Sequence, residues 1–350
     1  MKKILVFSNF GYVTNTIGGQ TVKVKHIYRL FEQKKKEEGF ELSYFDTDRL
    51  SVKWKIPFWL LVCFKELLKA SDIVFVGSKN NLKFFFPVIF LIAKIFNKKI
   101  DYIVVGGWLD NFLESHPLYV NLISSINGIY PETKSLCKIL SDKYGLNNVY
   151  RLNNFRFIEH GQKSNGSQKK TLNLVFLARV SKEKGVGTLF LLAQKIEKLG
   201  LNASIDIYGP LDPGYQQEFY EHLSNKASLI EYKGLVASDE VYSILSSYNL
   251  MLFPTIYEGE GFPGSVLDAY ISGIPVMASN WRYAHEFIED GKTGILAEFG
   301  NDNDFIQKTL LLLKNPDKLI HLTHNAKKES MKYSPEAAWK VLKNNMFKSE

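Results

Sequence analysis

The sequence is poor in cysteine and has no apolar run of membrane-spanning length. Cys63 and Cys137 are the two cysteines among 350 residues, which excludes a disulfide framework, and we expect both to be buried thiols in a reducing compartment. The strongly apolar run at 84–96 (FFFPVIFLIAKIF) has 13 residues and is interrupted by Pro87 and Lys94. Because a spanning helix needs about 20 apolar residues, this run does not cross a bilayer.

Signals for export and for nucleic-acid binding are also missing. Met1-Lys2-Lys3 leads into four apolar residues at 4–7, a run too short for a signal peptide and typical of a first buried strand. We therefore expect a cytoplasmic protein. Zinc-finger spacing and the aromatic signature of RNA-binding domains do not occur, so nucleic acid is not an expected partner.

Charge is distributed unevenly along the chain. Residues 1–157 contain 23 lysines and arginines and 13 acidic residues, a net charge of +10, whereas residues 158–350 contain 21 and 23, a net charge of −2. This asymmetry predicts an anionic partner for the first half, such as a lipid headgroup surface or a lipid pyrophosphate. The segment 53–69 (KWKIPFWLLVCFKELLK) places aromatic residues between lysines, as a peripheral element on the cytoplasmic face of an anionic membrane does. A helix buried against a sheet is the alternative.

Short apolar strands alternate with helix-length segments in both halves, which predicts parallel sheets wrapped by helices. The expected strands are 3–7, 42–45, 73–76, 100–105 and 128–130, then 174–177, 204–208, 230–232, 250–253 and 275–278. A polar segment at 159–170 cannot build a core and is expected to be a linker. We therefore predict two doubly wound α/β domains at 1–157 and 171–330, joined by a linker at 158–170, with ligands beyond the carboxyl ends of the strands in a cleft between the sheet edges.

The segment 254–279 (PTIYEGEGFPGSVLDAYISGIPVMAS) carries the most specific pattern. It begins at the end of a strand, passes through a glycine-rich turn and enters a helix near Ser265. Free backbone N–H groups and the positive end of that helix are suited to bind a phosphate. Glu260 before the helix and Asp268 about one turn inside it are expected to face one pocket. There, two carboxylates can accept hydrogen bonds from the hydroxyls of a sugar and a ribose.

The glycines of this turn also spell a dinucleotide-binding fingerprint, G-x-G-x-x-G, at Gly259, Gly261 and Gly264. That fingerprint normally follows the first strand of its unit and needs an acidic residue about 20 positions later. Here the turn follows the fourth expected strand of the second half, and no carboxylate stands near the end of the next strand before Glu286. A nicotinamide or flavin enzyme is therefore disfavoured.

Two cations, Arg179 and Lys184, follow the first strand of the second half. Beside a phosphate site at a helix end they can neutralise a diphosphate leaving group without a metal. The D-x-D sequence at Asp46 and Asp48 would make a poor magnesium site, because two carboxylates alone do not fill its coordination sphere. We predict no metal requirement.

Four segments resemble the conserved blocks of the retaining glycosyltransferases of family 4. They are FLARVSKEKG, IEYKGLV, MLFPTIYEGEGFPGSVLDAYISGIPVMAS and EFIEDGKTGIL, in the family's order and spacing over residues 174–300. The resemblance implies the GT-B architecture, in which two Rossmann-like domains face a central cleft. It also implies an acceptor-binding first domain, a donor-binding second domain, and a last segment, 331–350, whose helix packs back on the first domain.

The resemblance implies roles for particular residues. Arg179 and Lys184 would contact the donor diphosphate. Glu260 would bind hydroxyls of the transferred sugar, Asp268 would bind the ribose, and Val236 would lie beside the nucleobase. Asp268 stands where the family has glutamate and is one methylene shorter.

Further implied contacts come from two glycine-containing loops. Gly18 and Gly19 precede a helix and would let the backbone approach the donor phosphate or the acceptor, with an ordinary tight turn as the alternative. The second loop is the glycine-rich turn before Ser265. There Pro263 stands where the family often has a small residue, and proline has no backbone N–H to donate. The other members of that loop implied in donor binding are Gly261, Phe262, Gly264 and Ser265.

The first domain departs from the family pattern after a middle strand. The run 105–110 (VGGWLD) lacks the histidine that the family often places there. Asp110 and His116 are the candidates on the acceptor side, and an ordinary surface position is the alternative for His116.

These expectations converge on transfer of a hexose-type sugar, with retention of configuration, from a UDP- or GDP-sugar to a hydroxyl of a saccharide or lipid-linked acceptor in cell-surface polysaccharide synthesis. The donor is a substrate, no cofactor is expected, and a donor phosphate oxygen can serve as the base. Two alternatives remain open. One is a GT-B-like sugar-nucleotide epimerase using Asp110 and Glu114, and the other is a non-catalytic GT-B subunit of a polysaccharide assembly complex.

Overall fold

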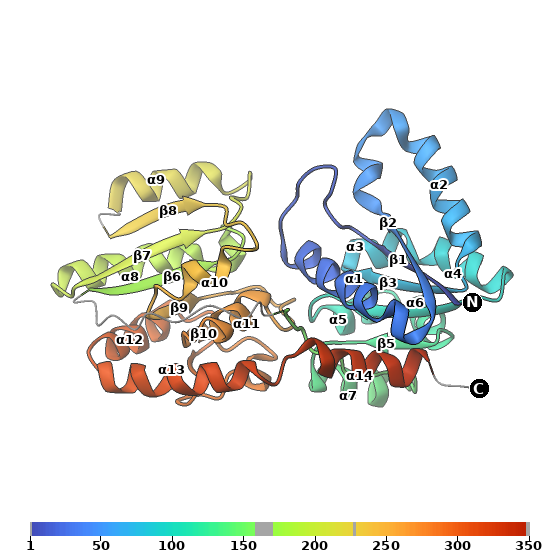
Figure 1. The fold of residues 1–350 in the computed structure, drawn as a ribbon. Coiled ribbons are helices and arrows are strands. Elements are labelled where there is room, and N and C mark those ends of the chain that lie inside the picture. Colours follow the sequence, from blue (N-terminus) through green and yellow to red (C-terminus); the bar gives the residue numbers. More distant parts are fainter. Residues whose placement is uncertain (1, 158–170, 227–228, 348–350) are drawn as a thin grey trace. The chain divides into compact units, whose positions relative to one another are not determined.

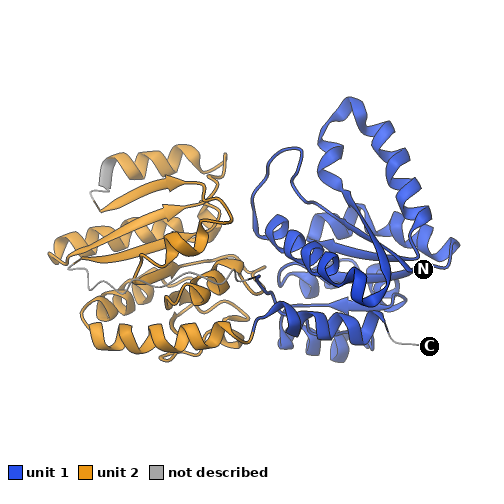
Figure 2. Ribbon diagram, viewed as in Figure 1, with its two compact units in different colours: residues 1–157, 333–350 blue, residues 158–332 orange. Residues whose placement is uncertain are grey.

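The computed structural model describes residues 2–157, 171–226 and 229–347 (Figure 1). It contains two compact units, one built from residues 1–157 and 333–350 and the other from 158–332 (Figure 2). The expected linker at 158–170 lies outside the described residues.

The described residues of the first unit form a five-stranded parallel sheet in the order β2-β1-β3-β4-β5. The strands are β1 (Lys2–Ser8), β2 (Phe40–Asp46), β3 (Asp72–Gly77), β4 (Lys99–Val104) and β5 (Gly128–Tyr130). They coincide with the five expected strands to within two residues at each end. The strand order reverses between β1 and β3, so the loops after these strands flank the position at which such sheets bind ligands.

Helices alternate with these strands along the chain, as the length of the intervening segments predicts. The first, α1, ends where Gly39 adopts a left-handed φ of 69°, a conformation that glycine adopts at low cost. The helices are α1 (Gly19–Glu38), α2 (Ile56–Lys69), α3 (Lys79–Phe84), α4 (Phe86–Ile95), α5 (Leu109–Ser115), α6 (Leu118–Ser124) and α7 (Lys134–Tyr144), with 3-10 turns at Thr47–Ser51 and Lys53–Lys55.

The last helix, α14 (Pro335–Met346), also belongs to the first unit. Ser334 caps it by accepting a hydrogen bond from the backbone N–H of Ala337, and proline suits the first turn because it has no N–H to satisfy. Trp339 is buried, and its ring meets Phe31 of α1 edge-on with ring centres 5.5 Å apart. The core of the first unit therefore joins the two ends of the chain.

In the second unit, the strands that the structure describes form a six-stranded parallel sheet in the order β11-β10-β9-β6-β7-β8. They are β6 (Leu172–Leu177), β7 (Ala203–Tyr208), β8 (Ile230–Gly234), β9 (Leu250–Phe253), β10 (Val276–Ser279) and β11 (Gly294–Ala297). The five expected strands are present, and β11 is an addition that the sequence pattern did not predict. The order reverses between β6 and β9, which is the arrangement of a doubly wound nucleotide-binding sheet.

The helices of the second unit are α8 (Val186–Lys198), α9 (Gln216–Lys226), α10 (Val241–Leu245), α11 (Gly264–Ile271), α12 (Asp302–Leu313) and α13 (Pro316–Ser330), with 3-10 turns at Lys182–Lys184 and Ala284–Glu286. Apolar residues of α8 and α12 form one buried cluster with those of β6, β7 and β9. This cluster holds the carboxyl ends of the central strands in place.

Burial decides between the two interpretations of the segment 53–69 and corrects one expectation about the cysteines. The alternative of a buried helix at 53–69 is wrong, because Leu67 is the one buried residue of the fully described α2. Cys63 and Cys137 are half-buried rather than buried, and neither forms a disulfide. Partial burial still raises the pKa of the Cys63 thiol to about 12. Over the described ranges, no helix combines the length and the apolar character needed to cross a membrane.

Candidate functional site

The candidate site lies at the carboxyl ends of β6 and β9, the neighbouring strands at which the order of the second sheet reverses. Gly185, in the loop after β6, has a φ of 72°, and a Cβ at this position would lie 1.8 Å from the carbonyl oxygen of Pro254 in the loop after β9. The backbone N–H of Ile256 donates to the Glu183 carbonyl at 2.9 Å. The two loops therefore pack backbone against backbone, which requires glycine at position 185.

This packing brings Lys184 and Glu260 together. Lys184 Nζ donates to Glu260 Oε1 in an ion pair, and Thr255 Oγ1 donates to the same oxygen at 3.0 Å. The Glu260 side chain is 8% exposed, so the lysine and the hydroxyl offset the cost of burying its charge. The ammonium also lies 5.1 Å from the ring centre of Tyr257 and 5.9 Å from that of Phe253. The lysine is thereby held between the carboxylate and two aromatic rings.

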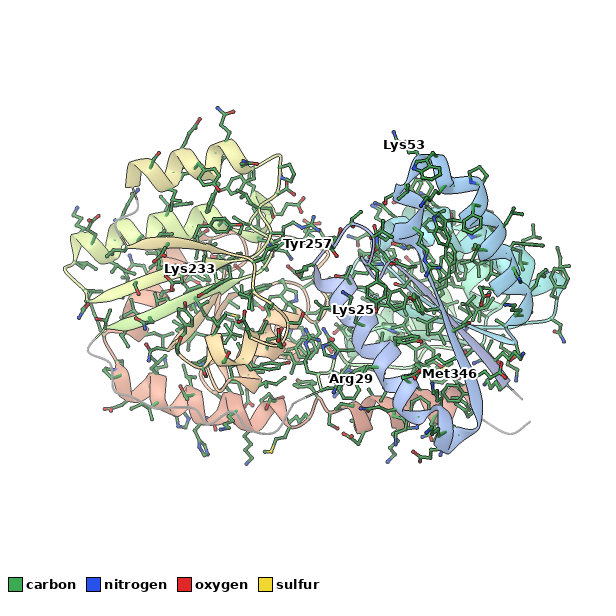
Figure 3. All side chains as sticks on the ribbon, turned by 45° about the horizontal axis from the view of Figure 1, so that its top comes forward. Lys25, Arg29, Lys53, Lys233, Tyr257 and Met346 are labelled. Atoms are coloured by element: carbon green, nitrogen blue, oxygen red, sulfur yellow. The ribbon has the colours of Figure 1, made fainter. Side chains whose placement is uncertain are left out.

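Two groups beside this pair are available to a ligand. Among the described residues, nothing donates a hydrogen bond to Glu260 Oε2. Arg179 is exposed, and within the same ranges its guanidinium makes no hydrogen bond or ion pair. Burial raises the pKa of Tyr257, the carboxylates of Glu260 and Glu183 add to this effect, and Arg179 opposes it. Arg179 therefore shares the electrostatic environment of Tyr257, which lies in the loop after β9 (Figure 3).

Contacts with aromatic side chains hold the glycine-rich turn in place. Phe262 stacks on Phe287 with ring centres 3.9 Å apart and planes inclined by 2°. Trp281 Nε1 donates to the Gly261 carbonyl at 3.2 Å. Pro263 is the N-cap of α11 and provides no side-chain cap. Its missing N–H removes one of the four donors that a helix start leaves without an intrahelical partner, and the remaining three belong to residues 264–266, which include Gly264 and Ser265.

Glu260 and Asp268 have different partners in the structure. Glu260 binds Lys184 and Thr255, whereas Asp268 Oδ1, on α11, accepts a hydrogen bond from Tyr242 of α10 at 3.4 Å. That the two carboxylates share one pocket stays a prediction. Val236 is half-buried in the loop that follows β8.

The glycine pair of the first unit does not form a tight turn. Gly18 is the N-cap of α1 with an extended backbone, and its N–H donates to Thr21 Oγ1 at 3.0 Å. A Cβ at Gly18 or at Gly19 would meet no atom within 4 Å. Backbone geometry therefore does not require glycine here, and the space beside both residues is open.

The carboxylates of the D-x-D sequence hold the loop after β1. Asp46 accepts hydrogen bonds from the backbone N–H groups of Phe10 and Tyr12 at 2.8 and 3.1 Å. Asp48 accepts from those of Val13 and Thr14 at 2.8 and 2.7 Å. Across the described ranges, no cluster of three or more histidine, cysteine, aspartate or glutamate side chains could hold a metal ion. Metal independence itself stays a prediction.

Asp110 and His116 are engaged within the first unit. Asp110 is buried and forms an ion pair with Lys143 of α7 at 2.9 Å, and it also accepts a hydrogen bond from the Tyr144 hydroxyl at 3.0 Å. The His116 ring stacks on Phe112 with centres 4.3 Å apart, and its Nδ1 lies 3.1 Å from the Phe112 carbonyl oxygen. The contacts of Asp110 join α5 to α7, and those of His116 lie at the carboxyl end of α5.

The structure adds a buried ionic group that sequence reasoning missed. Lys23 of α1 donates to Glu132 at 2.5 Å and to the Val104 carbonyl at 2.9 Å, at the carboxyl ends of β4 and β5. Burial lowers the pKa of Lys23, and Glu132 opposes that shift. Nearby on α1, burial and two arginines lower the pKa of His26 to about 3. Glu132 could have been found from its position two residues after an expected strand.

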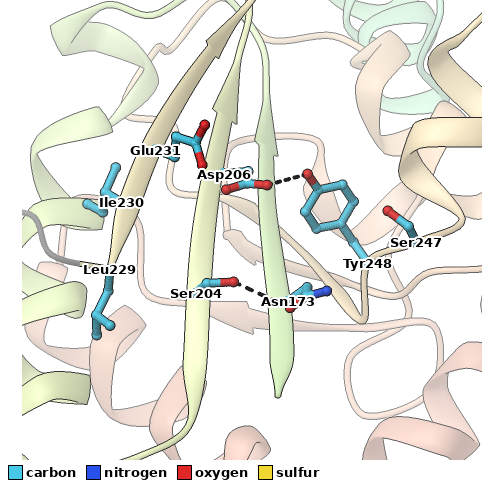
Figure 4. Close-up of a pocket in the computed structure, with 8 residues that line it drawn as sticks. All are labelled: Asn173, Ser204, Asp206, Leu229, Ile230, Glu231, Ser247 and Tyr248. Carbon is cyan, nitrogen blue, oxygen red and sulfur yellow. Dashed lines mark hydrogen bonds between the residues drawn. The ribbon is translucent and has the colours of Figure 1, made fainter. Parts of the chain in front are cut away.

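A hollow of about 520 Å³ in the second unit lies away from these groups (Figure 4). It is lined by Asn173, Ser204, Asp206, Leu229, Ile230, Glu231, Ser247 and Tyr248. Its polar groups bind one another: the Tyr248 hydroxyl donates to Asp206 at 2.6 Å and Ser204 donates to Asn173 at 3.3 Å. Asn173, Ser204 and Ile230 stand near the amino ends of their strands, so this hollow is at the wrong end of the sheet for the usual ligand position.

The two parallel-sheet units define the fold class. The chain is similar over 99% of its length to all of HepE from Anabaena, solved in complex with UDP and glucose, with a TM-score of 0.75 at 14% identity. It is also similar to a TarM variant from Staphylococcus aureus, solved with fondaparinux, alpha-GlcNAc-glycerol and UDP. The similarity has a TM-score of 0.67 and 21% identity and covers 83% of this chain and 59% of TarM. The chain therefore has the GT-B fold, which confirms the predicted fold class.

A family model matches the sequence of the second unit. Residues 157–329 match the family described as glycosyl transferases group 1. The matched range contains every residue of the candidate site described above at the ends of β6 and β9.

Two curated relatives come from Staphylococcus aureus. A poly(ribitol-phosphate) alpha-N-acetylglucosaminyltransferase of strain COL is 25% identical over 230 residues, which are 65% of this chain and 45% of the relative. The capsular polysaccharide biosynthesis glycosyltransferase CapM is 25% identical over 180 residues, 50% of this chain and 46% of CapM. The matched segments thus span about half the length of each relative.

Proposed function

We propose that the protein is a glycosyltransferase of cell-surface polysaccharide synthesis, which transfers a hexose-type sugar from a nucleoside-diphosphate sugar to a hydroxyl of a saccharide or lipid-linked acceptor. The observation that carries the proposal is the group of Lys184, Glu260 and Thr255 at the reversal point of the second sheet, with Glu260 Oε2 and Arg179 left open. Glu260 Oε2 can accept a hydrogen bond from a sugar hydroxyl, and the nearby guanidinium of Arg179 can bind a phosphate.

In this proposal the diphosphate of the donor binds between Arg179 and the amino end of α11. A guanidinium can bind two phosphate oxygens at once. The first-turn N–H groups of α11 have no side-chain cap, and such groups bind anions together with the positive end of the helix dipole. Charge that develops on the leaving diphosphate is then stabilised without a metal.

Glu260 positions the transferred sugar. Its Oε1 is occupied by Lys184 and Thr255, which fixes the orientation of the carboxylate. Its Oε2 is then free to accept from a sugar hydroxyl and to hold the ring over the bond that breaks. Lys184 lowers the repulsion between this carboxylate and the diphosphate.

The finer assignments rest on the family resemblance and on the relatives. We propose retention of configuration, with a donor phosphate oxygen as the base, because the family resemblance implies retention. The HepE and TarM structures contain UDP, which supports a UDP-sugar as the first donor to test and a GDP-sugar as the second. We also propose that Asp268 binds the ribose, that Val236 lies beside the base, and that the protein acts in the cytoplasm.

A thermal-shift panel of UDP-, GDP- and dTDP-sugars tests the proposal. A donor at about 100 times its Kd should stabilise the folded state by about 2.7 kcal/mol through mass action, and the melting temperature should rise for one nucleotide class. Arg179→Ala should reduce that rise, and Lys182→Ala should not. If no nucleotide sugar shifts the melting temperature of the well-folded chain, the donor site is wrong.

The two alternatives give different products. An epimerase would convert the nucleotide sugar without an acceptor, yet its candidate Asp110 is engaged with Lys143 and Tyr144. A non-catalytic subunit would bind no donor. Incubation of the stabilising nucleotide sugar with and without saccharide acceptors, followed by mass spectrometry, separates both from a transferase.

A further inference from the structure

Helix α2 of the first unit turns an apolar stripe outward. Positions 57, 61, 64 and 68 lie on one side of the helix, since residues three and four apart are neighbours on a helix surface. Leu61 is 71% exposed, Phe64 45% and Leu68 38%. The charged side chains Lys65 and Lys69 are exposed beside this stripe. An apolar face normally packs on a core, so its exposure along a 14-residue helix calls for a partner.

A second stripe with the same spacing lies next to it. At the end of α3 and along α4, Phe84, Val88, Leu91 and Ile95 are 65%, 59%, 58% and 65% exposed. Helices α2 and α4 pack against each other, and Figure 1 shows them along the same flank of the first unit. The two stripes therefore belong to one apolar surface, which we call the α2–α4 face and which is made of the exposed residues of 54–69 and 84–96.

The charge around this face is almost entirely positive. Residues 53–100 contain nine lysines and two acidic residues, a net charge of +7. Both acids are engaged: Glu66 pairs with Lys69 at 2.9 Å and Asp72 pairs with Lys2 at 3.0 Å. Lys53, at the start of the segment, points away from the first unit (Figure 3). An apolar centre with a cationic border complements an anionic lipid surface.

Trp54 strengthens this assignment. Its side chain is 79% exposed, and Lys55 Nζ lies 4.6 Å from its ring centre. Exposed tryptophan beside lysine is typical of the boundary between headgroups and acyl chains. A second copy of the chain would fit less well, because two such faces in contact would bring their lysines together.

We propose that the α2–α4 face lies in the headgroup region of an anionic bilayer, with α2 and α4 in the membrane plane and their apolar stripes inserted. This inference concerns the first unit and does not depend on the donor site proposed for the second. The lysines supply attraction to the surface, and the stripes supply the apolar area that holds the protein there.

Flotation of the full chain with phosphatidylglycerol-containing vesicles tests the proposal. The chain should float with these vesicles and much less with phosphatidylcholine vesicles, and binding should fall as salt rises. The double variant Leu61→Ser/Leu91→Ser should lower the partition coefficient by about tenfold or more. The matched control Leu311→Ser/Ile320→Ser removes side chains that are 67% and 64% exposed in the second unit and should bind as the original chain does.

Two further readouts separate the possible occupants. Tryptophan emission of the chain should shift to shorter wavelength on anionic vesicles and be quenched by brominated lipid, and Trp54→Leu should reduce both signals. Sedimentation velocity of the lipid-free chain shows whether copies associate. Equal binding to both vesicle types, or binding that Leu61→Ser/Leu91→Ser leaves unchanged, overturns the proposal. Self-association that this variant abolishes, without vesicle binding, overturns it as well and assigns the face to a second copy.

Discussion

The two units use the same parallel-sheet plan but fix their ligand-side loops in different ways. In the second unit the loops after β6 and β9 are locked by backbone packing at Gly185 and by the Lys184–Glu260 pair. In the first unit the loop after β1 is held by the carboxylates of Asp46 and Asp48. The second unit therefore has a preorganised site whose parts lie in short sequence blocks. The first has scattered polar groups and a large exposed apolar face. Changing one unit at a time should show how far this division of roles holds.

The largest effect is expected for Gly185→Ala. The residue would place Cβ 1.8 Å from the Pro254 carbonyl oxygen at a φ of 72°, so the backbone of both loops must move. We expect a loss of about 3 kcal/mol or more in the free energy of unfolding, measured by denaturant titration, and loss of donor binding.

The matched control is Gly187→Ala, two residues further into α8, where a Cβ would meet no atom within 4 Å. It should leave stability unchanged or raise it slightly, because alanine favours the helix. Equal stability of the two variants would show that the loops are not locked at Gly185.

Trp339→Ala should affect the first unit alone. The buried ring packs on Phe31, and its removal should cost about 3 kcal/mol. Hydrogen exchange followed by mass spectrometry should show lost protection in β1–β5 and unchanged protection in β6–β11. Lys340→Ala, at an exposed position on the same helix, serves as the control. Loss of protection in both units would mean that they unfold together.

Glu260→Gln should lower turnover by roughly two orders of magnitude. The amide oxygen can still accept from Lys184 and Thr255, but the group at Oε2 becomes a donor and cannot accept from a sugar hydroxyl. Because a negative charge is lost beside the diphosphate, affinity for the free nucleoside diphosphate should stay the same or rise. Asp268→Ala should weaken that affinity instead. Calorimetry with the nucleoside diphosphate checks both variants. If Glu260→Gln loses diphosphate binding while Asp268→Ala keeps it, the proposed orientation of the donor in this site is wrong.

The smallest effect is expected for Arg179→Ala, a reduction of kcat/KM by about tenfold or more, since one of several diphosphate contacts is lost. The protein should remain as stable as before, because the guanidinium has no hydrogen bond or ion pair with the described residues. Steady-state kinetics beside a melting curve separates the two effects. An unchanged kcat/KM would remove Arg179 from the donor site.

The sequence predicted ten strands because buried parallel strands are short, continuous apolar runs. It did not predict β11, whose apolar run is limited to Ile295, Leu296 and Ala297 and directly follows a turn. It also could not decide the position of α2, since an apolar helix is compatible with a core and with an exposed face. Arg179, Lys184 and Glu260 could be recognised as candidate site residues because they lie in sequence segments that resemble a known family.

What the sequence could not provide was the pairing within the site. Lys184 and Glu260 are 76 positions apart, and their contact depends on the close approach of two loops. The same holds for Lys23 and Glu132, which are 109 positions apart. Such pairings depend on which strands are neighbours in the sheet, and this order is not encoded by spacing along the chain.

The position of α14 has a consequence for synthesis. The first unit uses residues 1–157 together with 333–350, so its core is incomplete while the ribosome makes the whole of the second unit. At about 5–20 residues per second this interval lasts roughly ten seconds or more. During that time the surface around Phe31 lacks its cover, and a nascent chain at this stage is the form most in need of a chaperone. The second unit, which is continuous in sequence, can be the first to finish folding although it is the second to be made.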